Sequence, residues 1–414
     1  MTSKWEKTLV SDLGHIVTGK TPKTSVTEYY GGDVPFLTPS DNMDVKRITN
    51  TARTLSPSGV MSIKNCLIPE NSICVSCIGS GLGKVVMTTT PTVTNQQINS
   101  IIPNKHFDPD YIYYAMCILG EKLNYVSKTS TAVPIVNKSS FSKFTITVPL
   151  LTEQKAISKT LSALDDKIEL NNRINKNLEE MAQAIFKHWF VGFEFPDENG
   201  NPYKSSGGEM IESELGDIPK GWRVGILGDL LDNIKNSEKA GVHIKDIPYL
   251  PIDCIPMNSL SLNECNSGGE AKSSLIRFSK DDILIGAMRV YFHRVVLAPF
   301  DGITRTTCFV LRPKHKYMTP FALLLCNLDS TIEYAQNTSQ GSTMPYAVWD
   351  GGLQKLKIIV PNKDILVNFY KIISPVIEQI RDSLFEKNTL AVIRKSLLPK
   401  LMSGEIRVSM EEAI

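Results

Sequence analysis

Residues 153–190, which begin Glu153-Gln154-Lys155-Ala156-Ile157 and end Ile185-Phe186-Lys187-His188-Trp189-Phe190, are the stretch that decides the fold. No Pro or Gly interrupts them. Thr152 is placed to cap a helix, and Glu153 lies in the first turn, where a carboxylate favours the helix dipole. The stretch therefore predicts one uninterrupted helix, which at 1.5 Å per residue is about 55 Å long.

Apolar residues recur along this helix in alternating steps of three and four, the heptad pattern of a helix that packs on a second helix. They are Ile157, Leu161, Leu164, Ile168, Leu178, Ala182, Ile185 and Trp189. About 212 residues later the pattern returns with Phe369, Ile373, Val376, Ile380, Leu390, Leu397 and Leu401. Polar residues interrupt both patterns at matching places, Asn171 and Asn175 in one and Ser383 and Lys387 in the other. We expect an antiparallel pair whose polar positions meet near the middle and fix the register. Two ordinary core helices are the alternative, which the shared interruption disfavours.

An internal repeat sets the architecture. Trp5 to Leu13 returns as Trp222 to Leu230, and the apolar run that begins at Ile73 returns at Ile283. The spacing stays between about 210 and 217 residues, so the order is domain, helix, domain, helix. The expected segments are a first domain over 1–150, a spacer helix over 151–192, a linker over 193–217, a second domain over 218–361, a second spacer helix over 362–402 and a tail over 403–414.

Each globular domain has a mixed pattern. Short runs rich in Val, Ile, Thr and Phe predict strands, of which Ile73–Ile78 and Ile283–Met288 are two, and residues 110–123 and 320–334 predict helices. The alternation of a doubly wound parallel sheet is absent. The predicted fold class is α+β, with two repeated globular domains separated by two long antiparallel coiled-coil helices and an approximate two-fold relation between the halves.

The charge balance limits how the chain can bind nucleic acid. Its 414 residues include 45 Lys and Arg against 43 Asp and Glu, a net charge of +2. This balance excludes a strongly basic nucleic-acid-binding tail, so such binding must come from local basic loops or be shared with a partner. The polar residues 1–12 are unlike a secretory signal, no run reaches transmembrane length, and the eight Cys are scattered. We therefore expect a cytoplasmic protein without disulfides.

The catalytic and metal motifs that the sequence approaches are incomplete. The run from Gly79 to Lys84 is similar to a phosphate-binding loop, but Val85 stands where the magnesium-binding hydroxyl should be. Cys74 and Cys77 form a CxxC with no second pair or His cluster, so buried thiols are expected rather than zinc. Asn201-Pro202-Tyr203 lacks the second Pro of the adenine methyltransferase motif. We predict no catalytic residue and no metal site in this chain.

Two loops rich in small hydroxyl residues, 127–134 and 338–345, occupy matching places in the repeat, and both end in Pro. Such loops can approach a phosphate backbone closely and donate hydrogen bonds to it. Solvated turns are the alternative interpretation.

Several stretches together resemble the specificity subunit of type I restriction–modification systems, and the resemblance covers the whole chain. They are Val148-Pro149-Leu150-Leu151-Thr152-Glu153-Gln154-Lys155-Ala156-Ile157, Ile185-Phe186-Lys187-His188-Trp189-Phe190, Pro202-Tyr203-Lys204-Ser205-Ser206-Gly207-Gly208-Glu209-Met210, Ile218-Pro219-Lys220-Gly221-Trp222 and Arg394-Lys395-Ser396-Leu397-Leu398-Pro399-Lys400-Leu401-Met402-Ser403-Gly404-Glu405-Ile406. Each is weak alone, and their combination is specific.

The resemblance implies that each globular domain is a target recognition domain for half of a split DNA sequence. It also implies that the helices set the gap and dock two methyltransferase (modification) subunits, and that restriction subunits join the full complex. The chain itself would be non-catalytic and without a cofactor, with S-adenosylmethionine on the modification subunits. The alternative is a self-contained nuclease or DNA methyltransferase with duplicated recognition domains.

The base-reading positions of this family vary with the target, so none can be carried over by residue. From the loops alone we predict that the DNA-facing basic residues are among Lys20, Lys84, Lys128, Arg289, Arg294 and Arg305. Arg289 and Arg305 are the preferred candidates for base edges, because a guanidinium can pair with guanine at two atoms.

Overall fold

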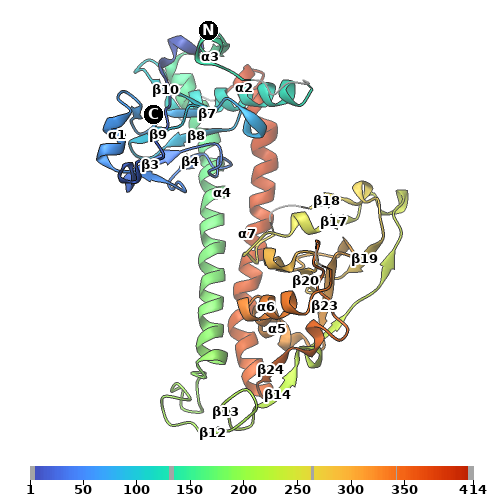
Figure 1. Ribbon diagram of the computed structural model, residues 1–414. Helices are drawn as coiled ribbons and strands as arrows, with labels where there is room; N and C mark the ends of the chain where they lie inside the picture. The colour runs from blue at the N-terminus through green and yellow to red at the C-terminus, as the bar shows by residue number, and fades with distance from the viewer. Residues whose placement is uncertain (1–4, 130–134, 263–264, 342, 409–414) are drawn as a thin grey trace. The chain divides into compact units, whose positions relative to one another are not determined.

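A computed structural model describes residues 5–129, 135–262, 265–341 and 343–408 (Figure 1). The chain forms two compact units. The first consists of Met1–Lys167 with Leu390–Ile414, and the second of Ile168–Thr389. Each unit therefore contains one globular domain and a part of each long helix. Helix by helix, none in the described ranges is both long enough and apolar enough to cross a membrane.

The two long helices are α4 (Leu151–Phe186) and α7 (Lys363–Ser403), with 36 and 41 residues. The first begins at Leu151, so Thr152 lies inside its first turn and is not the N-cap expected from the sequence. In α7 the side chain of Asn362 caps the helix by accepting a hydrogen bond from the backbone N–H of Ile365 at 3.0 Å. The α7 helix ends before Gly404, whose φ of +76° is the left-handed conformation common just after a helix.

Contacts inside each unit show that the helices run antiparallel. In the first unit Ile157 and Leu161, near the beginning of α4, share an apolar cluster with Leu401 near the end of α7. In the second unit the ring of Phe186, at the end of α4, lies 6.2 Å from that of Phe369 near the beginning of α7. The helix packing predicted from the two heptad patterns is thus present.

The residues predicted to lie on the packing faces of the helices differ in burial. Ile157, Leu161, Phe369, Ile373 and Ile380 are buried. The others are half-buried, namely Leu164, Ile168, Leu178, Ile185, Val376, Leu390 and Leu397.

The polar positions in the middle of both helices meet in the second unit. The side-chain amide of Asn171 donates to the carboxylate of Glu386 at 2.8 Å, and that of Asn175 donates to the carbonyl of Ile380 at 3.3 Å. Both Asn residues and Ser383 are buried. Because these bonds join particular residues of the two helices, a slip by one turn would leave buried amides unpaired, and the register is specified.

The first globular domain contains two mixed sheets. Strands β1 (Glu6–Leu9) and β11 (Thr145–Val148) pair separately, and β11 leads into α4. One sheet has the order β2 (Gly14–Thr18), β10 (Ile98–Pro103), β7 (Ile73–Ser76), β8 (Val85–Thr88) and β4 (Arg47–Ile48), and the other has the order β5 (Thr54–Leu55), β3 (Tyr30–Leu37), β9 (Thr92–Thr94) and β6 (Leu67–Ile68). Helices α1 (Pro57–Ser62), α2 (Pro109–Thr129) and α3 (Lys138–Ser142) complete it.

The second globular domain repeats this topology. Strands β14 (Arg223–Ile226) and β24 (Lys357–Val360) pair as β1 and β11 do. One sheet has the order β15 (Leu231–Asn233), β23 (Cys308–Pro313), β20 (Ile283–Gly286) and β21 (Val295–Leu297), and the other has the order β16 (Ser237–Glu238), β19 (Leu275–Phe278), β22 (Gly302–Arg305), β17 (Pro248–Leu250) and β18 (Asn266–Ser267). The parallel pair β17–β22 corresponds to the parallel pair β3–β9 of the first domain. The predicted α+β fold with a duplicated domain is confirmed.

The helix predicted over 320–334 is instead two helices, α5 (Thr319–Cys326) and α6 (Asp329–Asn337). Leu328 between them has an extended conformation, and the hydroxyl of Thr331 donates to the carbonyl of Leu325 at 2.7 Å. The same carbonyl accepts from the backbone N–H of Leu328 at 3.2 Å, so two hydrogen bonds satisfy it where α5 ends. No Gly or Pro stands between α5 and α6, and the polar residues Asn327, Asp329 and Ser330 are the only local sign of this break.

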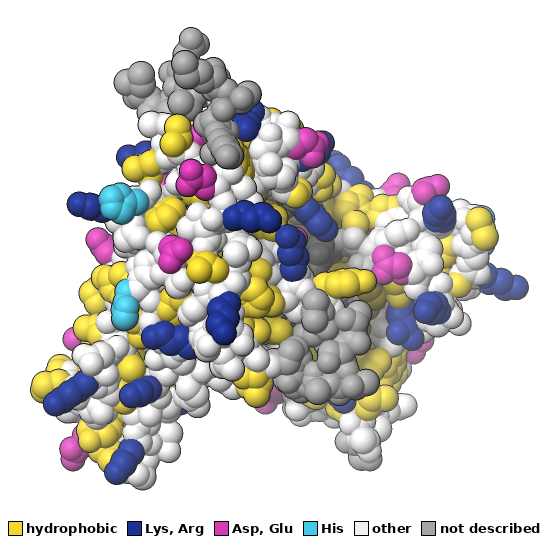
Figure 2. All heavy atoms as spheres, turned by 90° about the horizontal axis from the view of Figure 1, so that it is seen from above, with side chains coloured by type: hydrophobic (Ala, Val, Ile, Leu, Met, Phe, Trp, Pro, Cys, Tyr) yellow, Lys and Arg dark blue, Asp and Glu magenta, His cyan; other side chains and the backbone are white. Residues whose placement is uncertain are grey.

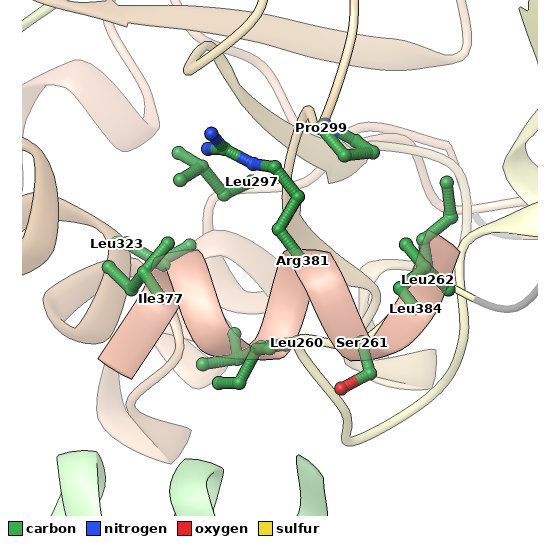
Figure 3. A pocket seen from close by; sticks show the side chains of 10 residues that line it. Leu260, Ser261, Leu262, Leu297, Pro299, Leu323, Ile377, Arg381 and Leu384 are labelled. Atoms are coloured by element: carbon green, nitrogen blue, oxygen red, sulfur yellow. The ribbon is translucent and has the colours of Figure 1, made fainter. Parts of the chain in front are cut away.

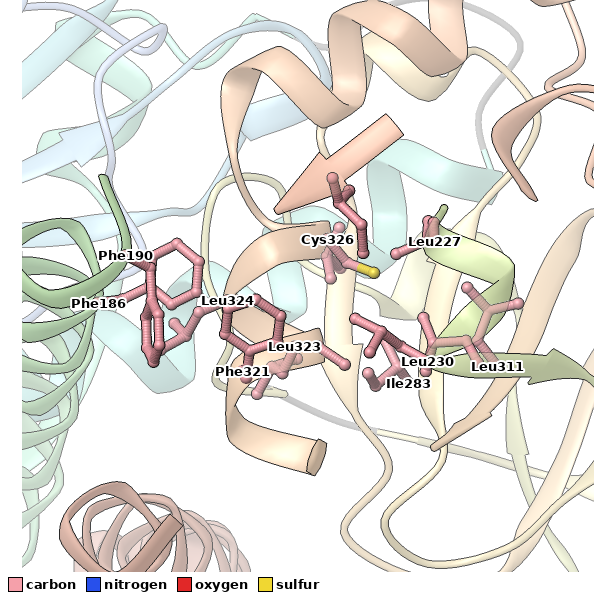
Figure 4. Close-up of a cluster of buried hydrophobic side chains, with 14 of the residues drawn as sticks. Phe186, Phe190, Leu227, Leu230, Ile283, Leu311, Phe321, Leu323, Leu324 and Cys326 are labelled. Carbon is pink, nitrogen blue, oxygen red and sulfur yellow. The ribbon is translucent and has the colours of Figure 1, made fainter. Parts of the chain in front are cut away.

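The core of the second unit joins the end of α4 to this domain through aromatic rings. Phe186 and Phe190 pack on Phe321 of α5 with ring centroids 5.6 and 4.7 Å apart (Figure 4). The chain after α4 then makes a π-helical turn, Lys187–Val191, and the short pair β12 (Met210–Ile211) and β13 (Ile218–Pro219) follows. In this segment Phe195 stacks between Tyr203 and Trp222, at 4.6 and 4.9 Å.

Candidate nucleic-acid interface

Each globular domain ties three loops together with the same two backbone hydrogen bonds. In the first domain the N–H of Cys77 donates to the carbonyl of Gln97 at 2.8 Å, and the N–H of Val136 donates to Cys77 at 3.0 Å. In the second domain Ala287 donates to Thr307 at 2.8 Å and Ala347 donates to Ala287 at 2.9 Å. We call this arrangement the clasp. It joins the turn after β7 or β20, the turn before β10 or β23, and the segment that follows the hydroxyl-rich loop.

The turn after the central strand has left-handed residues at the same two places in both clasps. Gly79 and Gly83 of the first domain have φ values of +75° and +86°, and Arg289 and His293 of the second have +51° at the matching places. A Cβ at Gly83 would lie 2.1 Å from the carbonyl oxygen of Gly120 in α2, so close packing explains that glycine. The glycine-rich run is therefore a strand-to-strand turn, which agrees with the absence of the complete phosphate-loop motif.

The second-domain clasp presents Arg289 and Arg305 to solvent. The N–H of Arg289 donates to the carbonyl of Pro345 at 2.8 Å, so this turn is fixed against the hydroxyl-rich loop. Arg305 ends strand β22, and the hydroxyl of Tyr346 donates to the carbonyl of its neighbour Thr306 at 2.9 Å. Both arginines are exposed, and neither has an ion-pair partner within residues 5–129, 135–262, 265–341 and 343–408.

Lys84 and Arg294, which match in the repeat, both contact their own domains. Lys84 forms an ion pair with Asp44 at 2.8 Å. The guanidinium of Arg294 donates to the carbonyl oxygens of Ile252, at 2.9 Å, and Ile255, and lies 5.8 Å from the ring centre of Phe292. These contacts give both residues a structural role, and their contact with DNA stays a prediction.

The remaining predicted residues are in the first domain. Lys20 is exposed and precedes Thr21, whose hydroxyl donates to the side-chain oxygen of Gln96 at 2.8 Å beside the clasp. Lys128 is in α2, but its side chain and most of the loop 127–134 lie outside the described residues. Gln96 is exposed, and sequence reasoning missed it because an amide in a short polar turn carries no charge signal.

Basic side chains do not form a single patch on the face shown in Figure 2. They are interspersed with apolar and neutral side chains, as the net charge of +2 leads one to expect. On this face, basic residues can therefore make separate, directed contacts with a phosphate backbone and offer no broad basic surface.

A charged network fixes the first domain to the helices within its unit. Asp165 of α4 is buried and accepts hydrogen bonds from Arg394 of α7 at 2.7 Å and from the hydroxyl of Tyr114 at 2.6 Å. Lys46 donates to Ser162 of α4 at 2.6 Å and pairs with Asp110 at 2.6 Å. Burial, and after it the carboxylate of Asp165, raises the pKa of the Tyr114 hydroxyl, so this group stays protonated and donates.

A different polar contact fixes the second domain to α4. The buried carboxylate of Glu179 accepts hydrogen bonds from the backbone N–H of Leu260 at 3.2 Å, the hydroxyl of Ser259 at 3.1 Å and the hydroxyl of Ser261. The same loop, with α7, lines a small apolar pocket (Figure 3). At the edge of this pocket Arg381 of α7 forms an ion pair with Asp281 at 2.5 Å.

Both helices also carry large apolar side chains that are exposed in the single chain. They are Leu170 and Met181 on α4, and Ile372, Phe385, Val392 and Ile393 on α7. Val392 is 69% exposed. Each of these six side chains leaves apolar surface in contact with solvent.

Comparisons with known proteins agree with this architecture. The family model described as "Type I restriction modification DNA specificity domain" matches residues 2–180 and 219–392, once for each half. The MjaIX specificity subunit of a type I restriction enzyme from Methanocaldococcus jannaschii is 28% identical, over 98% of this chain and 94% of its own length. The HindI specificity subunit from Haemophilus influenzae is 38% identical over 45% of this chain and 41% of its own length.

A crystal structure of a type I restriction–modification system S subunit from M. genitalium has the same fold. Its TM-score is 0.57 at 16% sequence identity, and the superposition covers 97% of this chain and 96% of that one. The family model matches most of the chain, and it does so on the two halves that the repeat defines. The chain belongs to the type I restriction–modification DNA specificity family.

Proposed function

We propose that this chain is the DNA-recognition subunit of a type I restriction–modification complex, in which each domain reads one half of a bipartite target. The observation that carries the proposal is the repeat. The DNA specificity model matches both halves, and both halves hold three loops in the same clasp. Two related domains with different loop residues are suited to two different half-sites. Recognition is the role of this chain, and chemistry on DNA belongs to its partners.

The partners would be two modification subunits, with restriction subunits in the full assembly. The exposed apolar residues of α4 and α7 support this proposal, because they offer apolar area that a partner subunit can cover. S-adenosylmethionine would be bound by the modification subunits, and this chain would need no cofactor. Because its net charge is only +2, the partners would also supply much of the phosphate neutralisation. The complex would act in the cytoplasm, where its DNA lies.

Random-sequence DNA selection with the complex of this chain and the modification subunits tests the proposal. We expect two short conserved blocks separated by a gap of fixed length. A single block, or no sequence preference, would contradict it. Incubation of the chain alone with labelled S-adenosylmethionine and target DNA should give no methylated DNA, and methyl transfer by the isolated chain would support the self-contained enzyme instead.

A paired insertion tests whether the helices set the gap. Asn175 of α4 is bonded to the carbonyl of Ile380 of α7, so adding four residues beside each of them lengthens both helices equally. The added length is about 6 Å per helix, or one to two base pairs at about 3.4 Å each. We expect the selected gap to grow by that amount with both blocks unchanged. An unchanged gap in an assembled complex would leave the helices with a docking role only.

A further inference from the structure

The second domain holds Arg289 and Arg305 on either side of Tyr346. Met288, next to Arg289, forms a β-bridge with Tyr346, whose hydroxyl donates to Thr306, next to Arg305. Burial raises the pKa of Tyr346, so its hydroxyl stays protonated and keeps this bond. The clasp bond between Ala287 and Thr307 joins the same two turns. The backbones that carry both arginines are therefore fixed to each other through short contacts.

The backbone at Arg289 has a strained, left-handed conformation. Its φ of +51° is left-handed, a conformation that costs about 1–2 kcal/mol for a residue with a Cβ. The first domain has Gly79 at the matching place, where a Cβ would meet nothing within 4 Å. Glycine would thus serve the turn without strain, so the turn itself does not require the exposed arginine side chain.

The two guanidinium groups differ from most others in the domain in having no internal partner. Arg294 donates to backbone carbonyls, Arg312 pairs with Asp282 at 2.7 Å, and Arg277 pairs with Glu238 at 2.6 Å. Arg289 and Arg305 are exposed and unpaired in the part of the chain that the structure describes. A guanidinium on a fixed backbone matches the O6 and N7 atoms of guanine in the major groove, and no other base offers that pair of acceptors.

We propose that Arg289 and Arg305 each bind a guanine, so that the half-site read by the second domain contains guanine at two positions. This inference rests on the proposed function. It applies to the second domain only, because the first has Gly79 and Asn95 at the matching places, and the side chain of Asn95 is bonded to Gln97.

The test compares selected DNA sequences for complexes that contain the natural chain, Arg289→Lys or Arg305→Lys. Exchange of residues 218–361 for those of a relative first identifies which block the second domain reads. Lysine keeps the charge but cannot make the planar paired contact. Each variant should lose preference at one guanine of that block, by about 5- to 150-fold, and should leave the other block and the salt dependence unchanged. Arg223→Lys is the matched control, since Arg223 is exposed in the same domain but pairs with Asp229 at 3.0 Å, and it should change nothing.

A modified base separates base contact from phosphate contact. Replacing the affected guanine with 7-deazaguanine removes N7 without altering base pairing, so it should weaken binding by the natural chain but not by the corresponding Arg→Ala variant. If the block read by the second domain contained no guanine, the inference would be wrong. It would also be wrong if the lysine variants kept the natural sequence preference. Either result would leave the bipartite target, and so the proposed function, unaffected. If the lysine variants bound all DNA sequences more weakly by the same factor, these residues would contact phosphates and not guanine, and the inference would be wrong. Absence of any bipartite target would refute the proposed function itself.

Discussion

Replacement of Glu179 by Ala should release the loop that fixes the second domain to α4. The carboxylate is 7% exposed and accepts bonds from the backbone N–H of Leu260 and the hydroxyls of Ser259 and Ser261. After the substitution both hydroxyls, which are half-buried, can turn to water, whereas the buried N–H of Leu260 has no other acceptor in place. A buried donor without a partner costs about 1–3 kcal/mol, and the lost charge-assisted bonds add to this cost.

The expected loss in the free energy of unfolding is thus about 2–4 kcal/mol for Glu179→Ala and about 1–2 kcal/mol for Glu179→Gln, which keeps one acceptor oxygen. Glu180 provides the matched control. It is the next residue on α4, is exposed, and contacts Lys176 at 3.9 Å. Glu180→Ala should cost no more than about 0.5 kcal/mol.

Urea unfolding followed by tryptophan fluorescence measures the loss in the free energy of unfolding of the second unit, which contains Glu179. Three of the four Trp residues, Trp189, Trp222 and Trp349, lie in that unit, and Trp5 lies in the first. Hydrogen exchange of the peptide that contains Leu260 gives a local measure. A loss of about 2 kcal/mol in the local opening free energy accelerates exchange by roughly 30-fold. If Glu179→Ala changed neither quantity more than Glu180→Ala does, the carboxylate would not hold this loop and the reasoning would be refuted.

Three further predictions concern other parts of the chain. Exchange of residues 1–150 for the matching domain of a relative should change one selected block only, and a change in both blocks would show coupled domains. Asp165→Ala should cost about 1–3 kcal/mol in urea unfolding, because the hydroxyl of Tyr114 loses its acceptor and the partly exposed Arg394 loses its ion-pair partner; an unchanged free energy of unfolding would contradict this. Hydrogen bonds from His243, and then from Arg277, lower the pKa of Glu238 from 4.5 to about 2. These hydrogen bonds stabilise the ionised carboxylate, which is why its pKa is lowered. Their contribution to stability should therefore be complete above about pH 4.5 and lost as the pH falls towards 2. A carboxyl titration of Glu238 by NMR should show the low midpoint, and an ordinary midpoint would refute it.

The long helices and the duplicated domain could be predicted from the sequence because their signals are local or recur. A heptad apolar pattern in a stretch without Pro or Gly specifies α4, and the recurrence of Trp5 as Trp222 specifies the repeat. The buried charges could not be predicted in this way. Asp165 and Glu179 interrupt the apolar pattern as solvated residues would, and their partners Arg394 and Ser259 are far away in the sequence. Only the folded chain shows that these carboxylates are buried and paired.

The candidate site shows the same limit. Arg289 and Arg294 lie in one turn, and the reason for preferring Arg289 from the sequence, its guanidinium, applies equally to Arg294. The fold separates them, since the carbonyls of Ile252 and Ile255 take up the guanidinium of Arg294 and leave that of Arg289 exposed. Burial of a side chain depends on residues that are about forty positions away, which no local pattern records. The sequence could therefore identify this basic loop, but not which of its two arginines is exposed.

The clasp explains how one fold can serve two unlike DNA half-sites. Its bonds join backbone atoms, at Cys77 and Gln97 in one domain and at Ala287 and Thr307 in the other, so they do not depend on which side chains the loops carry. The left-handed place in the turn accepts glycine in one domain and, at a cost of about 1–2 kcal/mol, arginine in the other. Loop residues can then change without loss of the three-loop geometry. For this reason we expect substitutions in the exposed clasp residues to alter sequence preference far more than they alter stability.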